Sequence, residues 1–273
     1  MTARIMGIVN VTPDSFSDGG EFLDPQRAIA HGRELAGEGA DVLDVGGEST
    51  RPGAEGVTAE EELVRVAPVV EALAGDNGPA VSIDTSKFAV AEAALGLGAT
   101  MVNDVTALRA EPDLAGLCAE RRCEVVLMHM LGDPRTMQED PVYEDVVDDI
   151  KAFLAERIEF AVSQGIEEKR IWVDPGIGFG KTVEHNLELH RRLGELAELG
   201  RPITFGSSRK SFIGKLTGAD VDQRLGGSIA SNVVAFANGA AMLRVHDVAP
   251  MRQALTVAEA ILDPEWRLDP ASP

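Results

Sequence analysis

Arg244 and His246 lie two residues apart at the end of the apolar segment 242–245. Residues two apart on a β-strand face the same side of the sheet, so the guanidinium and the imidazole are expected to be neighbours. Such a pair suits a phosphate-like anion, because both groups can donate hydrogen bonds to its oxygens. The alternative is a basic pair that is simply exposed at a strand end, and the spacing alone does not separate the two.

The segment 206–214 runs from an apolar stretch into a short helical one and carries Lys210 and Ser211. The start of a helix presents free N–H groups and the positive end of its dipole, which favour a carboxylate or a phosphate. Lys210 adds a mobile charge and Ser211 adds a hydroxyl group. A capped helix start with solvated cations is the alternative interpretation.

Asp84, Asn103 and Asp174 sit at the ends of three separate apolar segments. One carboxylate can accept two parallel hydrogen bonds from a flat heterocycle that has an amino group beside a ring N–H. A second aspartate and an asparagine can hold the other edge of such a ring. Buried carboxylates need partners, although an aspartate at a strand end can also cap the following helix. The set indicates a pocket for a polar heterocycle.

The stretch 174–182 is rich in glycine and ends in Lys181 and Thr182. It lacks the glycine spacing of a P-loop, so we do not expect a nucleoside triphosphate site here. The glycines are expected to let the backbone turn close to a ligand, with Phe179 offering a flat face. Two further stretches, 10–20 and 46–53, are polar and rich in glycine, and we expect them to be mobile loops that close over a site and exclude water.

The elements that must position these side chains alternate between apolar strand-like runs and amphipathic helical runs. The expected strands are 5–9, 42–45, 80–83, 101–102, 124–128, 171–173, 203–205 and 242–245, and the expected helices include 25–38, 59–74, 88–96, 145–164, 185–199 and 228–238. Such alternation predicts a parallel sheet, and about eight units predict closure into an α/β (β/α)₈ TIM barrel. Nearly every expected strand ends in a polar residue or a glycine-rich turn. In a barrel these ends share one rim, where such folds carry their chemistry.

The chain has 273 residues and a formal net charge of −20. A (β/α)₈ barrel commonly forms one domain of about 250 residues, so we expect a single domain over 1–273, with 263–273 as a surface tail. The acidic charge disfavours nucleic-acid and membrane partners, which need basic patches. The chain shows neither the apolar core of a signal peptide nor a membrane-spanning run, so a cytoplasmic location is expected. Cys118 and Cys123 are expected to be ordinary buried or partly buried thiols.

Eight stretches together resemble the dihydropteroate synthase family, in the family's order from the first strand to the last. They are residues 6–20, 44–54, 82–85, 103–104, 127–130, 174–181, 208–211 and 244–248. The two long loop motifs, 10–20 and 46–53, are the most specific of these. The resemblance implies an enzyme that joins a dihydropterin pyrophosphate to para-aminobenzoate on the way to folate, uses Mg²⁺ and forms a homodimer.

The resemblance also implies residue roles. The pterin pocket is expected from Asp84, Asn103, Asp174 and Lys210, with Met128 and Phe179 as walls. The pyrophosphate and magnesium end is expected from Asn10, Arg244 and His246, and contacts for para-aminobenzoate from Thr50, Arg51 and Ser211. The residues expected to take part in catalysis are Asp84, Lys210, Arg244 and His246, together with Asp14 and Asp18 as loop carboxylates that stabilise positive charge on the pterin methylene.

Two alternatives remain open at this point. A methyltetrahydrofolate:corrinoid methyltransferase would share the fold and the pterin carboxylates, but it would have no use for the phosphate-directed pair Arg244 and His246. A homologue that has lost catalysis would keep the pterin pocket and bind without turnover.

Overall fold

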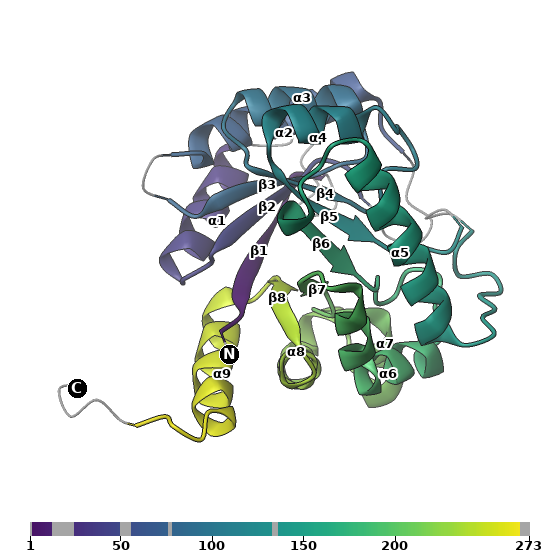
Figure 1. Ribbon diagram of the computed structural model, residues 1–273. Helices are drawn as coiled ribbons and strands as arrows, with labels where there is room; N and C mark the ends of the chain where they lie inside the picture. The colour runs from purple at the N-terminus through teal and green to yellow at the C-terminus, as the bar shows by residue number, and fades with distance from the viewer. Residues whose placement is uncertain (1, 13–24, 50–55, 76–77, 133–135, 268–273) are drawn as a thin grey trace.

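The computed structural model describes residues 2–12, 25–49, 56–75, 78–132 and 136–267. Parallel strands close into a barrel in chain order, from β1 beside β2 through to β8 beside β1 (Figure 1). The strands are β1 Arg4–Asn10, β2 Val42–Gly46, β3 Ala80–Asp84, β4 Met101–Asp104, β5 Glu124–Met128, β6 Ile171–Asp174, β7 Ile203–Phe205 and β8 Ala240–Val245. The predicted (β/α)₈ barrel is therefore confirmed.

Helices surround the strands on the outside of the barrel (Figure 1). They are α1 Pro25–Gly37, α2 Ala59–Leu73, α3 Phe88–Gly96, α4 Leu114–Arg121, α5 Val146–Ser163, α6 Val183–Arg191, α7 Ser211–Thr217, α8 Leu225–Ala237 and α9 Val248–Leu262. Short 3₁₀ turns lie at Glu168–Arg170, Leu193–Leu199 and Val221–Gln223. Helices α4 and α9 had not been named from the sequence pattern.

Several helix starts are fixed by side chains that the sequence provides locally. Thr58 and Glu61 form a reciprocal capping box at the start of α2, which satisfies two backbone N–H groups that have no partner inside the helix. Asp145 accepts hydrogen bonds from the N–H groups of Val147 and Asp148 at the start of α5. These caps explain why the predicted starts of both helices agree with the observed ones to within one residue.

One expected helix is divided into two pieces. The segment 185–199 was predicted as one helix, whereas α6 ends at Arg191 and a 3₁₀ turn follows over Leu193–Leu199. Gly194 lies inside the second piece and lowers its α-helical propensity. Leu193 and Leu196 are both buried, and side chains three residues apart line up on a 3₁₀ helix. The leucine spacing therefore favours the tighter turn.

Helix α8 begins three residues earlier than predicted, at Leu225, and contains Gly226 and Gly227 in its first turn. A methyl group at Gly227 would overlap the Cγ2 atom of Ile213 on α7. The glycine therefore lets α7 and α8 approach each other. Its low helical propensity had obscured the start of the helix in the sequence.

The interior of the barrel is closed on one side by a layer of apolar side chains, here called the barrel floor. Its members are Met6, Val42, Met101, Val126, Trp172 and Met242, from six different strands. Beneath it, Glu124 accepts hydrogen bonds from Trp172 Nε1 at 3.0 Å and from Arg4 Nη1 at 3.0 Å. In the part of the chain that the structure describes, the barrel is thus packed through its N-terminal half, and folds of this kind place their ligand sites at the C-terminal ends of the strands.

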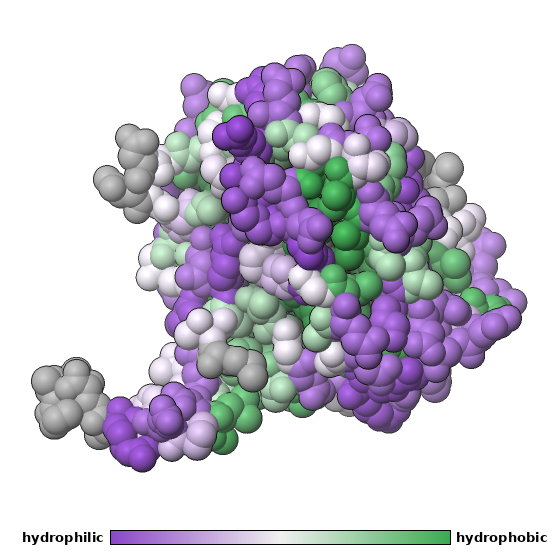
Figure 2. All heavy atoms as spheres, in the orientation of Figure 1, coloured by the Kyte–Doolittle hydropathy of each residue, from purple (hydrophilic) through white to green (hydrophobic). Residues whose placement is uncertain are grey.

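Hydrophilic side chains cover much of the face drawn in Figure 2, in keeping with the net charge of −20. Cys118 and Cys123 are buried and free, as expected. The part of the expected tail that the structure describes, residues 263–267, is exposed. Within the described ranges, no helix is both long and apolar enough to span a membrane.

Candidate active site

A layer of mostly polar side chains lies directly above the barrel floor. Each member follows a floor residue by two positions on its own strand and therefore faces the same interior. These members are Asp44, Asn103, Met128, Asp174 and Arg244. Asp84, the last residue of β3, joins them because it pairs in register with Asn103 on β4. The strand geometry thus gathers polar groups that lie up to 200 residues apart in the chain.

Arg244 is the central cation of this layer. Its Nε donates to Oδ2 of Asp44 at 2.6 Å, and its Nη2 donates to Oδ2 of Asp84 at 2.7 Å. Burial lowers the pKa of Arg244, but the charges of Asp44 and Asp84 outweigh this effect and hold it above its ordinary value. The guanidinium is therefore a permanent positive charge that bridges β2 and β3 from β8.

The two aspartates of the predicted heterocycle pocket are both poised to change charge near neutral pH. Burial raises the pKa of Asp84 to about 7, against the opposing effect of Arg244. Burial also raises the pKa of Asp174 to about 6, while a hydrogen bond from the N–H of Gly176 and the charge of Lys210 oppose the shift. Carboxyl groups with strongly shifted pKa values are typical of ligand sites, because burial and neighbouring charges are arranged there to suit a bound partner.

Asp44 is the member of the layer to which the sequence gave no role. It was noted only as a polar residue at a strand end, yet its side chain is fully buried and contacts two predicted site residues. Besides Arg244, the amide Nδ2 of Asn103 donates to Asp44 Oδ2 at 3.0 Å. A charged residue inside an otherwise apolar strand was the available signal.

Phe179, Met128 and Lys210 form one wall of the site. Phe179 and Met128 belong to a small buried apolar cluster with Met130 and Met137. The Nζ atom of Lys210 lies 4.0 Å from the centroid of the Phe179 ring. Burial and the charge of Arg244 lower the pKa of Lys210 to about 8, although Asp174 and Asp84 oppose the shift. Lys210 is therefore still mostly protonated at neutral pH.

Two of the glycines after β6 pack against another loop of the protein, whereas the sequence had suggested a close approach to a ligand. Gly176 has φ +67, and a methyl group there would overlap the backbone carbonyl of His129. Gly180 has φ +62, and a methyl group there would lie 2.8 Å from the carbonyl oxygen of Leu131. The loop thus turns tightly against the β5–α5 connection, and this contact within the protein already requires both glycines.

Lys181, at the end of this loop, is 3% exposed and points into the protein. Its Nζ donates to the carbonyl of Phe179 at 2.9 Å and lies 3.0 Å from Nδ1 of His129. Burial lowers the pKa of Lys181 to about 7 and that of His129 to about 2. His129 is therefore neutral and accepts a hydrogen bond, and Lys181 fastens the loop that carries Phe179.

His246 follows β8 and is held by Ser208. The Ser208 hydroxyl oxygen accepts from the backbone N–H of His246 at 3.2 Å and lies 3.0 Å from its Nδ1. Burial and the charges of Arg209 and Arg244 lower the pKa of His246 to about 3, so the ring is neutral at pH 7. The simplest satisfied arrangement has Ser208 donating to Nδ1, which leaves the proton on Nε2. Arg209, which precedes Lys210, is anchored by a bidentate ion pair with Asp247.

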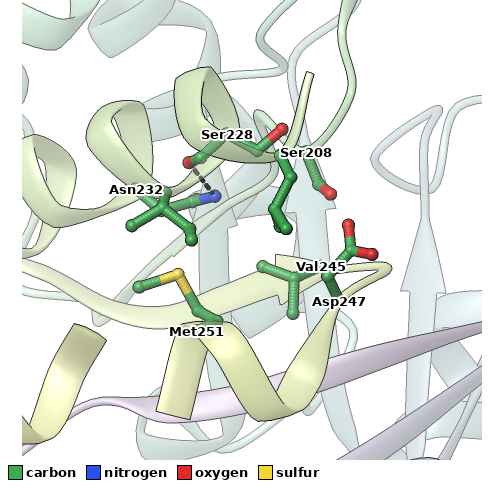
Figure 3. A pocket seen from close by; sticks show the side chains of 8 residues that line it. Ser208, Ser228, Asn232, Val245, Asp247 and Met251 are labelled. Atoms are coloured by element: carbon green, nitrogen blue, oxygen red, sulfur yellow. Dashed lines mark hydrogen bonds between the residues drawn. The ribbon is translucent and has the colours of Figure 1, made fainter. Parts of the chain in front are cut away.

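A small pocket lies behind this corner, between the start of α8, the end of β8 and α9 (Figure 3). Its lining includes Ser208, Ser228, Asn232 and Asp247. The Oδ1 atom of Asn232 is buried without a hydrogen-bond partner among the described residues. Because none of the residues expected to bind the heterocycle lines this pocket, it is separate from the layer above the barrel floor.

The structure thus brings most of the predicted site together. Asp84, Asn103, Asp174 and Arg244 share one layer, and Lys210 lies against Phe179 beside them. Asn10 is the half-buried last residue of β1, paired in register with Gly46, and Ser211 is the exposed first residue of α7. The predicted residues Asp14, Asp18, Thr50 and Arg51 lie outside the described residues.

A closed parallel barrel with buried carboxylates, an asparagine and an arginine at its C-terminal rim defines a pterin-binding enzyme. The family model described as pterin binding enzyme matches residues 6–246. The chain is 44% identical over 264 residues to the dihydropteroate synthase of Synechocystis sp., a match that covers 96% of this chain and 90% of that protein. The chain belongs to the dihydropteroate synthase family, transferases of folate biosynthesis.

Solved structures agree with this assignment. The dihydropteroate synthase of Xanthomonas albilineans with 4-aminobenzoic acid is similar at a TM-score of 0.89 and 50% identity, over 95% of this chain and 93% of that one. A structure of the Xanthomonas albilineans enzyme in complex with 7,8-dihydropteroate has a TM-score of 0.86 and 48% identity, over 95% and 94% of the two chains.

Proposed function

We propose that this chain condenses 6-hydroxymethyl-7,8-dihydropterin pyrophosphate with para-aminobenzoate to give 7,8-dihydropteroate and pyrophosphate. The hydrogen bond between Arg244 and Asp84 carries the proposal. It joins a cation suited to a pyrophosphate to a carboxylate suited to a pterin edge, so one molecule with both groups fits the site. Similar structures with 4-aminobenzoic acid and with 7,8-dihydropteroate support the same pair of substrates.

The pterin ring is proposed to bind above the barrel floor. Asp84, Asn103 and Asp174 would meet its amino and ring N–H groups, because ionised carboxylates accept hydrogen bonds in pairs. Lys210 would donate to an acceptor on the ring, and Met128 and Phe179 would cover its faces. The buried position of these groups supports the proposal, since hydrogen bonds to charges are stronger where water is excluded.

The leaving pyrophosphate is proposed to lie against Arg244 and His246. Arg244 supplies a permanent charge, and His246 supplies an N–H donor from Nε2. The reaction breaks the C–O bond between the pterin methylene and the pyrophosphate, which keeps the electron pair. The nitrogen of para-aminobenzoate then forms the C–N bond and loses a proton to water. Aniline-type nitrogens are uncharged at neutral pH, so the reaction needs no strong general base.

A magnesium ion at this end of the site would have few protein ligands. Within the described ranges no group of three or more His, Cys, Asp or Glu side chains is suited to hold a metal. Magnesium often retains several waters and binds mainly through substrate phosphates, and the amide oxygen of Asn10 is a suitable donor. We propose Asn10 as its protein ligand. When bound, the ion would neutralise charge on the leaving group.

Further roles rest on the family resemblance. Thr50, Arg51 and Ser211 are proposed to contact para-aminobenzoate, and Asp14 and Asp18 to stabilise positive charge on the methylene. A direct test is Asp18→Ala, because unchanged turnover would remove Asp18 from the mechanism.

The proposed reaction is tested by pyrophosphate release. Purified protein would receive the pterin pyrophosphate and Mg²⁺, with and without para-aminobenzoate. Release that depends on the arylamine, with dihydropteroate as product, is the expected result. Tight pterin binding without release would instead indicate an inactive homologue, and no binding of either substrate would refute the proposal. Arg244→Met should abolish release, whereas the matched variant Arg252→Met removes an α9 arginine that pairs with Asp41 and should retain it.

We also propose that the protein is a homodimer that buries the outer face of α8 and α9. These helices pack against each other and expose Val234 at 48%, Val257 at 55% and Ile261 at 75%. Neighbouring exposed apolar side chains are typical of an interface. Light scattering should show a dimer that Val257→Glu with Ile261→Glu converts to a monomer. Val64→Glu on α2, where the valine is 76% exposed, is the matched control and should leave the dimer intact.

A further inference from the structure

Asp44 contacts two residues of the proposed site from within the same layer. It lies on β2, directly opposite Ile8 on β1 and Ser82 on β3, and its side chain has no exposed surface. One of its oxygens, Oδ2, accepts from Arg244 Nε at 2.6 Å and from Asn103 Nδ2 at 3.0 Å. A single buried atom therefore fixes two side chains that come from strands on different parts of the barrel wall.

The hydrogen bond to Nε determines how Arg244 lies. With Nε directed at Asp44 and Nη2 directed at Asp84, the guanidinium plane is held along the edge that carries these two nitrogens. Among the hydrogen bonds of the described residues, none involves Nη1. Arginine recognises phosphate oxygens through a rigid planar fork, so the plane must be aligned before the ligand arrives.

The hydrogen bond to Asn103 determines which end of its amide faces Asp44. Nδ2 must point at the carboxylate, because a carboxylate accepts hydrogen bonds and the Oδ1 atom of the amide cannot donate one. Asn103 Oδ1 is thereby turned away from Asp44. The donor and acceptor positions that Asn103 can offer to a ligand are thus set by Asp44 and not by Asn103 alone.

We propose that Asp44 is a positioning residue, which aligns Arg244 and Asn103 so that the pterin ring and the pyrophosphate are held in one register. This inference rests on the proposed function. Asp44 also limits a competing contact. Without its charge, Asp84 would be the remaining carboxylate that pairs with Arg244, and the arginine would draw Asp84 away from the ligand.

The electrostatic effect of Asp44 on Asp84 provides a readout that a purely structural role would not move. Burial is the largest cause of the raised pKa of Asp84, Arg244 opposes it, and the charges of Asp44, Glu62 and Asp104 add to it. The charge of Asp84 in turn acts on Lys210. Asp44→Asn removes a negative charge near Asp84 and should therefore lower the pKa of Asp84. The pH below which pterin binding is lost should then move to a lower value.

The experiment compares Asp44→Asn with the wild type and with Asp104→Asn. Asp104 is also fully buried, but it accepts hydrogen bonds from Thr106 and from the backbone of Leu108 and touches neither Arg244 nor Asn103 among the hydrogen bonds of the described residues. Calorimetry would give the dissociation constant for the pterin pyrophosphate as a function of pH. At pH values where Asp84 is ionised, we expect Asp44→Asn to raise it at least about tenfold, as for a lost hydrogen bond to a charged group, and Asp104→Asn to leave it nearly unchanged. Asp104 also adds to the raised pKa of Asp84, by less than Asp44 does, so both variants should lower the pH below which pterin binding is lost, Asp44→Asn by more.

A double-mutant comparison separates positioning from general damage. In an Arg244→Met background the further change Asp44→Asn should raise the dissociation constant much less than it does in the wild type. Arg244, one of the two hydrogen-bond partners of Asp44, is already absent there. Equal effects in both backgrounds would overturn the inference.

A readout without ligand keeps the inference distinct from the proposed function. The Nε–H signal of Arg244 in a ¹H–¹⁵N spectrum should be sharp and slow to exchange in the wild type and in Asp104→Asn, and lost or shifted in Asp44→Asn. If the wild type binds no pterin yet this signal responds as expected, the proposed function fails while the positioning role stands. An unchanged Arg244 signal in Asp44→Asn would refute the positioning role itself.

Discussion

The ammonium group of Lys210 lies over the ring of Phe179, with Nζ 4.0 Å from the ring centroid. The contact joins the loop after β6 to the segment before α7, and both flank the proposed pterin position. It keeps a buried cation beside a flat aromatic face, an arrangement that stabilises the charge without a carboxylate in direct contact.

Phe179→Leu should therefore weaken pterin binding while the protein stays folded. Leucine keeps an apolar wall but offers no π face to Lys210 or to a pterin ring. We expect the dissociation constant for the pterin pyrophosphate to rise about tenfold, with little change in melting temperature. Phe160→Leu removes the ring under Arg157 on α5, away from the site, and should not alter binding. A similar loss in both variants would contradict a specific role for Phe179.

Ser208→Ala should change the tautomer of His246. The variant removes the hydroxyl group that faces Nδ1 at 3.0 Å, so the ring proton is no longer confined to Nε2. The ¹⁵N shifts of the two ring nitrogens should report a mixture, and kcat/KM for the pterin pyrophosphate should fall about fivefold. Ser207 is the matched control, because its buried hydroxyl has no hydrogen-bond partner in the described part of the chain. Ser207→Ala should leave the shifts and the rate unchanged.

Asp174→Asn should stabilise the free protein and abolish its affinity for the pterin. Burial raises the pKa of Asp174 from 3.8 to about 6, so the folded state binds the proton more tightly than the unfolded chain. This group makes stability fall as pH rises from about 4 to 6, and the full penalty is present above that range. At pH 7.5 the asparagine variant should be more stable by about 1–3 kcal/mol, and the gain should vanish below about pH 4.

Chemical denaturation at several pH values measures this difference. Asp145→Asn is the control of opposite sign. Hydrogen bonds from the backbone of Asp148 and from Arg192 hold the pKa of Asp145 below its ordinary value, so that variant should lose stability at neutral pH. A stability gain for Asp174→Asn that does not depend on pH would contradict the assigned cause.

Gly176→Ala should be severely destabilising, whereas Gly200→Ala should be mild. Both glycines have nearly the same left-handed backbone, with φ of 67° and 65°, so the conformational penalty of about 1 kcal/mol is shared. Only at Gly176 does an added methyl group overlap another backbone atom, the carbonyl of His129. Thermal unfolding should show a loss of at least about 3 kcal/mol at Gly176. Equal losses at both positions would refute the steric explanation.

Much of the fold was predictable because its signals are local. The strand segments were located to within two residues at either end, since buried parallel strands are short apolar runs that end where polar loops begin. The division of 185–199 was missed because it depends on the packing of Leu193 and Leu196. The early start of α8 was missed because Gly227 is required by close packing against Ile213 on another helix, which the sequence does not reveal.

The gathering of the predicted residues at one end of the barrel could be predicted from the sequence, but the hydrogen bonds that join them could not. Asp84, Asn103, Asp174 and Arg244 were recognised from their types and from the family resemblance. The contacts of Asp44 were not, because they depend on the register that brings Asp44 of β2 beside Arg244 of β8. The same holds for Lys181, whose burial against His129 follows from the fit between two loops.

The barrel floor also constrains the order of events in a catalytic cycle. Met6, Trp172 and their neighbours form one buried cluster in the lower half of the barrel, so within the described residues a ligand would reach the site from the C-terminal rim. A molecule seated directly on the floor has to enter before anything that sits above it, and it cannot leave while the upper occupant remains. Steady-state kinetics should therefore follow a compulsory sequence, with the pterin first and the arylamine second, and an early arylamine should act as an obstruction.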